Sequence, residues 1–161
     1  MSAKTSLSEL DLICKQAQEA KIDLRRSSKA KKNDALKYAA EFLLKNKAKL
    51  IDANTIDMEL ASQKDLQDSF VDRLELNEKR IDSMISGLDK VINLDDPVGQ
   101  TDQPHTSPSG FEVSKMRVPL GVIGIIYESR PNVTADASAL CLKSGNACIL
   151  RGGSELSLIH I

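Results

Sequence analysis

The sequence predicts an α/β fold in which a helical region is followed by a strand–helix–strand unit. Apolar residues recur at helical spacing over residues 1–94. Residues 95–110 then change to loop chemistry, with Pro, Gly, Ser and Asp in close succession. From residue 118 onward, an apolar run rich in Val and Ile, a charged turn, a small-residue helix and a short apolar run follow in that order. This order is the unit from which parallel nucleotide-binding sheets are built.

The first two helices are predicted from their apolar stripes and caps. The stripe of the first helix comprises Leu7, Leu10, Ile13, Ala17 and Ala20. Ser27 and Ser28 are good caps for a second, longer helix, because a serine hydroxyl accepts hydrogen bonds from the first turn. Its buried stripe is expected to comprise Leu36, Ala40, Leu43 and Leu50. Asn54 is expected to end or interrupt this helix, and the polar, acidic residues 56–72 are expected to form short helical pieces.

A third long helix, a strand or hairpin arm and the strand–helix–strand unit complete the prediction. Asn77 can cap the helix, whose expected core face comprises Ile81, Met84, Ile85, Leu88 and either Val91 or Ile92. Residues 111–118 alternate in part, which indicates a strand or the arm of a hairpin. In the following unit, Gly121 and Gly124 are expected to allow close packing or a bulge in the first strand. Gly145 is expected to terminate the helix as a C-cap glycine.

Composition argues against several classes of protein. The net charge is −1, so no overall field attracts the chain to nucleic acid or to a membrane surface. Aromatic residues make up only 3% and Trp is absent, which disfavours stacking platforms for bases or sugars. Three widely spaced cysteines argue against a disulfide framework and favour the cytoplasm. A basic cluster is expected to be a solvated helix face rather than a nucleic-acid site, and comprises Arg25, Arg26, Lys29, Lys31 and Lys32.

Two segments resemble a known family. Glu128-Ser-Arg-Pro-Asn132 and Leu150-Arg-Gly-Gly-Ser-Glu155 are similar to signature segments of the gamma-glutamyl phosphate reductases, which belong to the aldehyde dehydrogenase superfamily. The resemblance implies an aldehyde dehydrogenase-like fold, with N-terminal helices followed by the first βαβ unit of an incomplete Rossmann-type cofactor domain. It assigns residues 1–155 to the N-terminal part of an NADP-binding domain, with helices in residues 1–94 and a possible oligomerisation arm near residues 99–118.

The resemblance also implies an activity. Members reduce L-glutamate 5-phosphate to L-glutamate 5-semialdehyde with NADPH, releasing phosphate, in the synthesis of proline from glutamate. The nucleophilic cysteine of that reaction has no counterpart among the residues of this sequence. We therefore expect the 161-residue chain by itself to be inactive, and the full-length protein to be a homo-oligomer that binds a small-molecule substrate but neither nucleic acid nor membrane.

Residues 156–161 form a separate case. Leu156-Ser-Leu-Ile-His-Ile161 does not resemble the family, and it matches one translated frame of a common transposon-end sequencing adaptor. We interpret these six residues as adaptor translation and exclude them from the expected fold. A natural short C-terminus is the alternative.

Asn132 and Arg130 are the candidate residues for chemistry and for the substrate. Asn132 precedes a predicted helix, so capping alone would explain it. By resemblance, Asn132 instead donates its side-chain amide to the oxyanion that forms when a cysteine attacks the carbonyl. Arg130 has the planar donor fork that suits phosphate or carboxylate, and the implied substrate has both. A surface arginine, or one paired with Glu128, is the simpler alternative.

Arg151, Ser154 and Glu155 are the candidate cofactor ligands. They follow the end of the second predicted strand, where nucleotides bind in open α/β sheets. By resemblance, the Ser and Glu occupy a segment that contacts the adenosine ribose, and an arginine in this segment favours the 2′-phosphate of NADPH. The segment is neither a Gly-x-Gly-x-x-Gly fingerprint nor a P-loop, so a Gly-Gly turn with solvated charges is the alternative.

The cysteines and histidines are expected to have structural roles or none. Cys14, Cys141 and Cys148 are interpreted as small buried or half-buried residues. His105 lies in a Pro/Ser/Thr loop and is expected to be exposed, and neither residue type shows metal-ligand spacing. Two other functions stay open: another aldehyde dehydrogenase with a different acyl substrate, and a non-catalytic helical interaction module.

Overall fold

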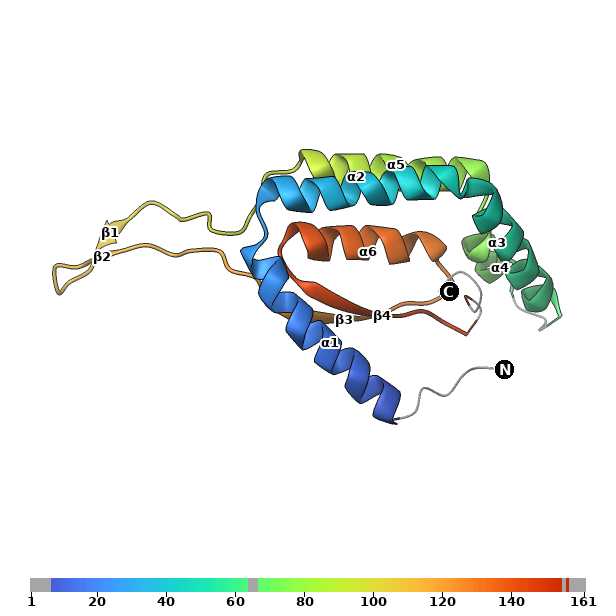
Figure 1. Cartoon of the computed structure of the whole chain (residues 1–161), viewed down its shortest axis with the longest axis horizontal. Coiled ribbons are helices and arrows are strands. Elements are labelled where there is room, and N and C mark those ends of the chain that lie inside the picture. The colour runs from blue at the N-terminus through green and yellow to red at the C-terminus, as the bar shows by residue number, and fades with distance from the viewer. Residues whose placement is uncertain (1–6, 64–66, 155, 157–161) are drawn as a thin grey trace.

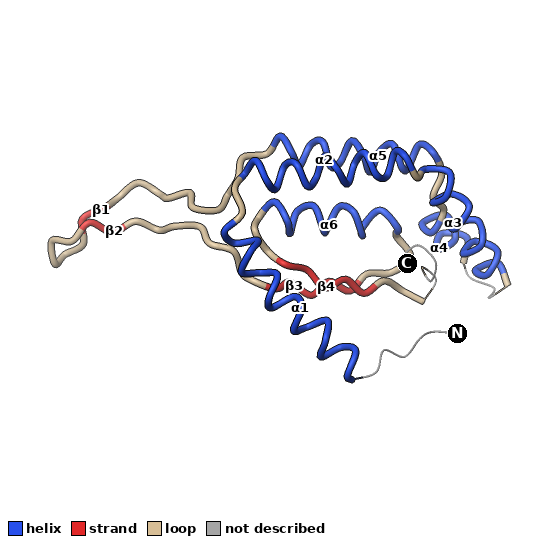
Figure 2. Tube along the Cα trace, viewed as in Figure 1, coloured by secondary structure: helices blue, strands red, loops and turns tan. Residues whose placement is uncertain are grey.

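The computed structural model describes residues 7–63, 67–154 and 156 of the chain. Figures 1 and 2 show a helical layer, a small parallel sheet and a long arm that projects away from both. The elements are α1 (Leu7–Arg26), α2 (Lys29–Lys45), α3 (Lys47–Ser62), α4 (Asp68–Leu74), α5 (Glu78–Asn93), β1 (His105–Thr106), β2 (Glu112–Val113), β3 (Val122–Ile126), α6 (Pro131–Lys143) and β4 (Ala147–Arg151). None of the helices within the described ranges is both long and apolar enough to cross a membrane.

Two predicted helix starts are confirmed by their capping hydrogen bonds. The Ser28 hydroxyl accepts from the backbone N–H of Lys31 at 3.2 Å and caps α2. The Asn77 side chain accepts from the backbone N–H of Arg80 at 3.0 Å and caps α5. Each bond satisfies one of the N–H groups that a first helical turn leaves free.

The expected end of the second helix at Asn54 is wrong. The break lies at Asn46, whose side-chain amide donates to the carbonyl of Phe42 at 2.9 Å. Asn54 lies inside α3 and is 2% exposed. Its amide donates to the carbonyl of Leu74 at 2.9 Å and accepts from the N–H of Leu76 at 2.6 Å. The asparagine therefore satisfies the backbone between α4 and α5, which is a tertiary role rather than a helix-ending one.

The predicted strand–helix–strand unit is confirmed. β3 and β4 pair in parallel, from Val122 opposite Ala147 to Ile126 opposite Arg151. α6 packs between this sheet and the layer formed by α2 and α5, while α1 contacts mainly β4 (Figure 1). One buried cluster joins the helical layers and comprises Leu36, Ala40, Leu88 and Ala139. Burial of this apolar surface is the main force that holds α6 against α2 and α5.

Gly145 ends α6 as predicted. Its φ is +73°, and its N–H donates to Leu142 at 3.0 Å while the N–H of Asn146 donates to Cys141 at 2.8 Å. This pair of bonds is the Schellman arrangement, in which glycine accommodates the left-handed backbone. Gly124, which we expected to allow close packing or a bulge, is not closely packed, because a Cβ built there would have no neighbour within 4 Å.

The predicted hairpin arm is present between α5 and β3. β1 pairs antiparallel with β2, with His105 opposite Val113 and Thr106 opposite Glu112. His105 is exposed as expected. Five large apolar residues along the arm and its return are exposed, namely Phe111, Val113, Met116, Val118 and Leu120.

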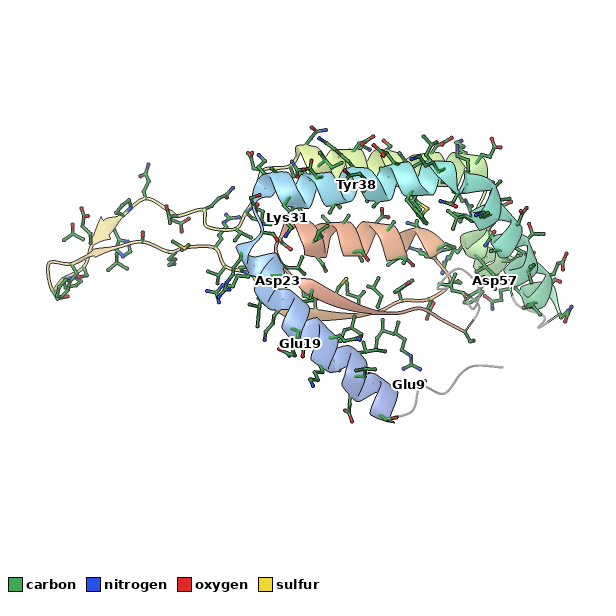
Figure 3. All side chains as sticks on the ribbon, in the orientation of Figure 1. Glu9, Glu19, Asp23, Lys31, Tyr38 and Asp57 are labelled. Atoms are coloured by element: carbon green, nitrogen blue, oxygen red, sulfur yellow. The ribbon has the colours of Figure 1, made fainter. Side chains whose placement is uncertain are left out.

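The basic cluster is only in part a solvated face. Lys31 is exposed near the start of α2 (Figure 3). The neighbouring Lys32 is 2% exposed, and its ammonium donates to both carboxylate oxygens of Asp96 at 3.0 and 2.7 Å and to the carbonyl of Lys143 at 3.3 Å. The solvated-face interpretation is therefore wrong for Lys32, because an ion pair and a helix-end carbonyl stabilise its buried charge.

Candidate active site

The two segments that carry the sequence motifs lie at one edge of the parallel sheet. The β3 strand ends at Ile126, opposite Arg151 at the end of β4. The N–H of Tyr127 extends this pairing by donating to the carbonyl of Arg151 at 3.0 Å. Residues 127–130 lead from there into α6, and residues 152–154 continue from β4. The carboxyl edge of a parallel sheet is where open α/β folds bind their ligands.

Asn132 is not the N-cap of α6, so the capping alternative for this residue is wrong. Arg130 is the N-cap residue, with φ −128° and ψ 93°, and Pro131 occupies the first helical position. Asn132 therefore lies within the first turn and does not cap the helix. Its side chain is exposed, and its amide nitrogen donates to Oδ2 of Asp136 at 3.0 Å. An amide nitrogen has two hydrogens, so one donor is left for a ligand beside the positive end of the helix.

A pocket of about 340 Å³ lies between the start of α6 and the α4–α5 turn. We call it the helix-end pocket. Arg130, Pro131 and Asn132 line it from α6, so the structure brings the two predicted substrate-side residues together. Its charged lining residues are Asp72, Arg73, Glu75, Arg80, Arg130 and Asp136. Arg73 and Arg80 were not predicted, because residues 56–72 and the following turn show only a polar pattern in the sequence.

The charges in the helix-end pocket are unevenly paired. Arg80 donates to the carbonyl of Glu75 at 2.7 Å and to a carboxylate oxygen of Asp72 at 2.9 Å, and it also bonds the carbonyl of Asp72. The Glu75 carboxylate lies 3.8 Å from the same guanidinium. Within the described part of the chain, neither Arg73 nor Arg130 has an ion-pair partner. The expected pairing of Arg130 with Glu128 is therefore not observed.

A glycine on α5 sets how closely the site approaches the helical layer. A Cβ built on Gly87 would lie 3.2 Å from Oδ1 of Asp136. The other oxygen of Asp136 holds the Asn132 amide. Gly87 thus lets α5 lie close to the residue that orients Asn132, where a larger side chain would contact it.

The cofactor candidates lie at the end of β4. Arg151 is the last residue of the strand and is exposed, and its side chain has no hydrogen-bond or ion-pair partner within the described ranges. Ser154 is exposed in the turn that follows Gly152 and Gly153. Glu155 lies outside the described residues. The arrangement leaves a guanidinium and a hydroxyl-bearing turn at the sheet edge where nucleotides bind.

None of the cysteines that the structure describes lines the helix-end pocket. Cys14 is exposed, so the expectation that it is buried is wrong. Cys141 is buried, and burial, together with the nearby Cys148 thiol, raises its pKa above the ordinary value. A thiol held protonated is a poor nucleophile. The described residues include no group of three or more His, Cys, Asp or Glu that could hold a metal ion.

A second cavity of about 940 Å³ lies between α1, α2, α6 and β4. It is lined by apolar and small polar side chains and by no charged one. The described part of its lining therefore offers no charged group to bind an anion. Leu156, which we excluded from the expected fold, is buried in a separate cluster with Ala61 and Leu74.

The fold and the site together define a partial aldehyde dehydrogenase-like domain. A Bacillus subtilis protein described as an aldehyde dehydrogenase shares the fold, with a TM-score of 0.68 at 19% identity over 94% of this chain. Crystal structures of gamma-glutamyl phosphate reductase are similar as well. The Thermotoga maritima enzyme has a TM-score of 0.84 and is 46% identical over 90% of this chain. The Saccharomyces cerevisiae enzyme has a TM-score of 0.88 and is 35% identical over 96% of this chain.

Curated relatives agree with these structures. The gamma-glutamyl phosphate reductase of Thermodesulfovibrio yellowstonii is 51% identical over 147 residues, and that of Halothermothrix orenii is 56% identical over 124 residues. The chain spans about a third of these relatives, 35% and 30% respectively. No family model matches the chain. The chain is therefore similar, at about half of the aligned positions, to roughly a third of the length of gamma-glutamyl phosphate reductases.

Proposed function

We propose that the full-length protein reduces L-glutamate 5-phosphate to L-glutamate 5-semialdehyde with NADPH, releasing phosphate, as a step of proline biosynthesis. The observation that supports this most directly is the helix-end pocket, which places an unpaired guanidinium from Arg130 beside the amide of Asn132. The first group suits a phosphate, and the second suits an oxygen that becomes negative during acyl transfer. The names of the relatives support the substrate class.

Each residue of this chain then has a distinct task. Asn132 donates its free amide hydrogen to the carbonyl oxygen of the substrate, whose negative charge the start of α6 also stabilises. Asp136 keeps the amide in place through the 3.0 Å hydrogen bond. Arg130 holds the phosphate group until it leaves. The nucleophile that displaces the phosphate comes from outside this chain, since no described cysteine lines the pocket.

The cofactor proposal rests on the end of β4. NADPH, when bound, supplies the hydride that reduces the acyl carbon. The exposed Arg151 guanidinium suits its 2′-phosphate, since it has a planar fork of donors and no partner among the described residues. Ser154 and Glu155 are proposed to contact the adenosine ribose. An Arg151→Gln variant is expected to weaken NADPH binding more than NADH binding.

The hairpin arm is proposed to join subunits of the full-length protein. Backbone hydrogen bonds join its two halves at β1–β2 and again near its base, so the arm is a two-stranded ribbon with open outer edges. Several large apolar side chains on it are exposed. Such an arm can pair with another chain. The proposed compartment is the cytoplasm, which the unpaired, widely spaced cysteines favour.

The test of the proposed function is an activity assay on the full-length protein and its Asn132→Ala variant. Loss of one oxyanion donor is expected to lower kcat by about 10²–10³ with a smaller effect on KM. Asn93→Ala is a matched control, because this asparagine donates only to a carbonyl of its own helix, α5. Full activity in Asn132→Ala, or turnover of simple aldehydes in preference to the phosphorylated substrate, would refute the proposal. Absence of NADPH binding would favour a non-catalytic module instead.

A further inference from the structure

The helix-end pocket has a pattern of uncompensated charge that the proposed reaction does not by itself explain. Asp72 and Glu75, the carboxylates next to Arg73 along the chain, are both engaged by Arg80. Arg73 lines the pocket from α4, and within the described ranges its guanidinium has no ion-pair partner. Arg130 is the second guanidinium without an ion-pair partner among the described residues, and it lines the same pocket from the start of α6.

The carboxylate of Asp136 has a hydrogen-bond partner but no ion-pair partner among the described residues. The hydrogen bond that it accepts comes from the neutral amide of Asn132, and no Lys or Arg of the described residues forms an ion pair with it. Among the described lining residues, the pocket thus presents two free cations and one free anion. A ligand that complements this set has two anionic groups and one ammonium group. A phosphorylated α-amino acid has this combination, with its carboxylate, its phosphate and its α-ammonium.

We propose that Arg73 is a specificity-determining residue that binds the α-carboxylate of the substrate, and that Asp136 accepts its α-ammonium group. This inference rests on the proposed function and extends it to the amino-acid end of the substrate. Arg130 lies two residues from Asn132 at the start of α6, where the reacting carbonyl and its phosphate belong. Arg73 lines the same pocket from the separate element α4, so the second guanidinium comes from a different element than the residues at the proposed reacting end. Guanidinium and carboxylate form paired, charge-assisted hydrogen bonds that suit this role.

The experiment separates the two anionic ends of the substrate. The reaction is run in reverse on the full-length enzyme, where semialdehyde, inorganic phosphate and NADP⁺ give the acyl phosphate, NADPH and a proton. The carboxylate and the phosphate then belong to different substrates with separate KM values. Arg73→Gln is expected to raise KM for the semialdehyde roughly 10- to 100-fold, while KM for phosphate, kcat and Tm stay unchanged. Arg73→Lys keeps the charge but loses the fork, so an intermediate increase is expected.

Arg26→Gln is the matched control, because Arg26 is an exposed arginine at the end of α1 that does not line the helix-end pocket. Arg130→Gln is the complementary variant, and it is expected to raise KM for phosphate. An unchanged KM for the semialdehyde in Arg73→Gln, or an increase confined to phosphate, would overturn the inference. If the unsubstituted enzyme does not oxidise the semialdehyde at all, the proposed function fails, which is a separate result.

Discussion

Two neighbouring ion pairs allow the effect of burial on stability to be measured within one chain. Lys32 with Asp96 and Lys29 with Asp95 join the same helix start to the same loop after α5. The side chains of the first pair are 1% and 15% exposed, and those of the second pair are 51% and 88% exposed. The N–O distances are 2.7 and 3.2 Å. The same substitution, Asp to Asn, can therefore be made in a buried and in an exposed setting.

We expect Asp96→Asn to lower the free energy of unfolding by about 3 kcal/mol, because removing one partner leaves the Lys32 ammonium buried without a counter-charge. Asp95→Asn is expected to lower it by less than about 1 kcal/mol, the usual range for exposed pairs. Urea unfolding of the 161-residue chain at micromolar concentration, followed by circular dichroism, measures both. The double variant Lys32→Met with Asp96→Asn should recover part of the loss, because the buried charge is then gone as well.

Equal effects of Asp96→Asn and Asp95→Asn would refute this reasoning, since burial would then not decide the strength of the pair. The pH dependence gives a second check. Burial by itself would raise the pKa of Asp96. The opposing effects are larger: hydrogen bonds from Lys32 and from the N–H of Val98, together with the nearby lysine charges, hold the pKa below the ordinary 3.8. The stabilisation is therefore present above about pH 4 and is lost as the pH falls through the lowered pKa. Asp96→Asn should remove this part of the acid sensitivity.

Three further predictions concern local structure and chemistry. Gly145→Ala is expected to destabilise the chain by more than about 1 kcal/mol, because φ is +73° and the added Cβ would lie 2.9 Å from Pro119. Gly110→Ala is the control in the same unfolding assay: φ is +85° there and no atom lies within 4 Å of the added Cβ, so only the backbone strain should appear. The exposed Cys14 is expected to react first with a thiol reagent in the native protein, and Cys141, whose pKa burial raises, should react only after unfolding. The 161-residue chain is expected to show no reductase turnover in an activity assay. It is also expected to aggregate at high concentration, because the described parallel sheet has two strands with open edges, and light scattering tests this.

The sequence was most informative where the determining interactions are local. The caps at Ser28 and Asn77, the C-terminal glycine at Gly145 and the order strand, helix, strand depend on residues within a few positions of one another, and all were predicted correctly. Asn132 was placed at the correct helix, and only the capping alternative for it is wrong, because Arg130 takes the capping position and Pro131 begins the helix.

The misjudged residues depend on partners far away in the sequence. Lys32 looks like one member of a solvated basic run, but its partner Asp96 lies 64 residues further along the chain. Asn54 looks like a helix terminator, but it bonds the backbone 20 and 22 residues away. Arg73 could not be assigned at all, because the pocket that it lines forms only when α4 meets the start of α6. Sequence patterns report periodicity and caps, whereas these contacts arise from the packing of separate elements.

The close approach of α5 at Gly87 has a consequence for how this protein tolerates substitution. Gly87 touches no substrate in the proposed reaction, yet an added methyl group would press on Asp136, which orients Asn132. A mutational scan that scores turnover should therefore place position 87 among the sensitive positions, whereas a scan that scores abundance should rank it near its helical neighbours. Disagreement between the two scans at a glycine remote from the reacting atoms would identify a packing contact that serves catalysis rather than folding.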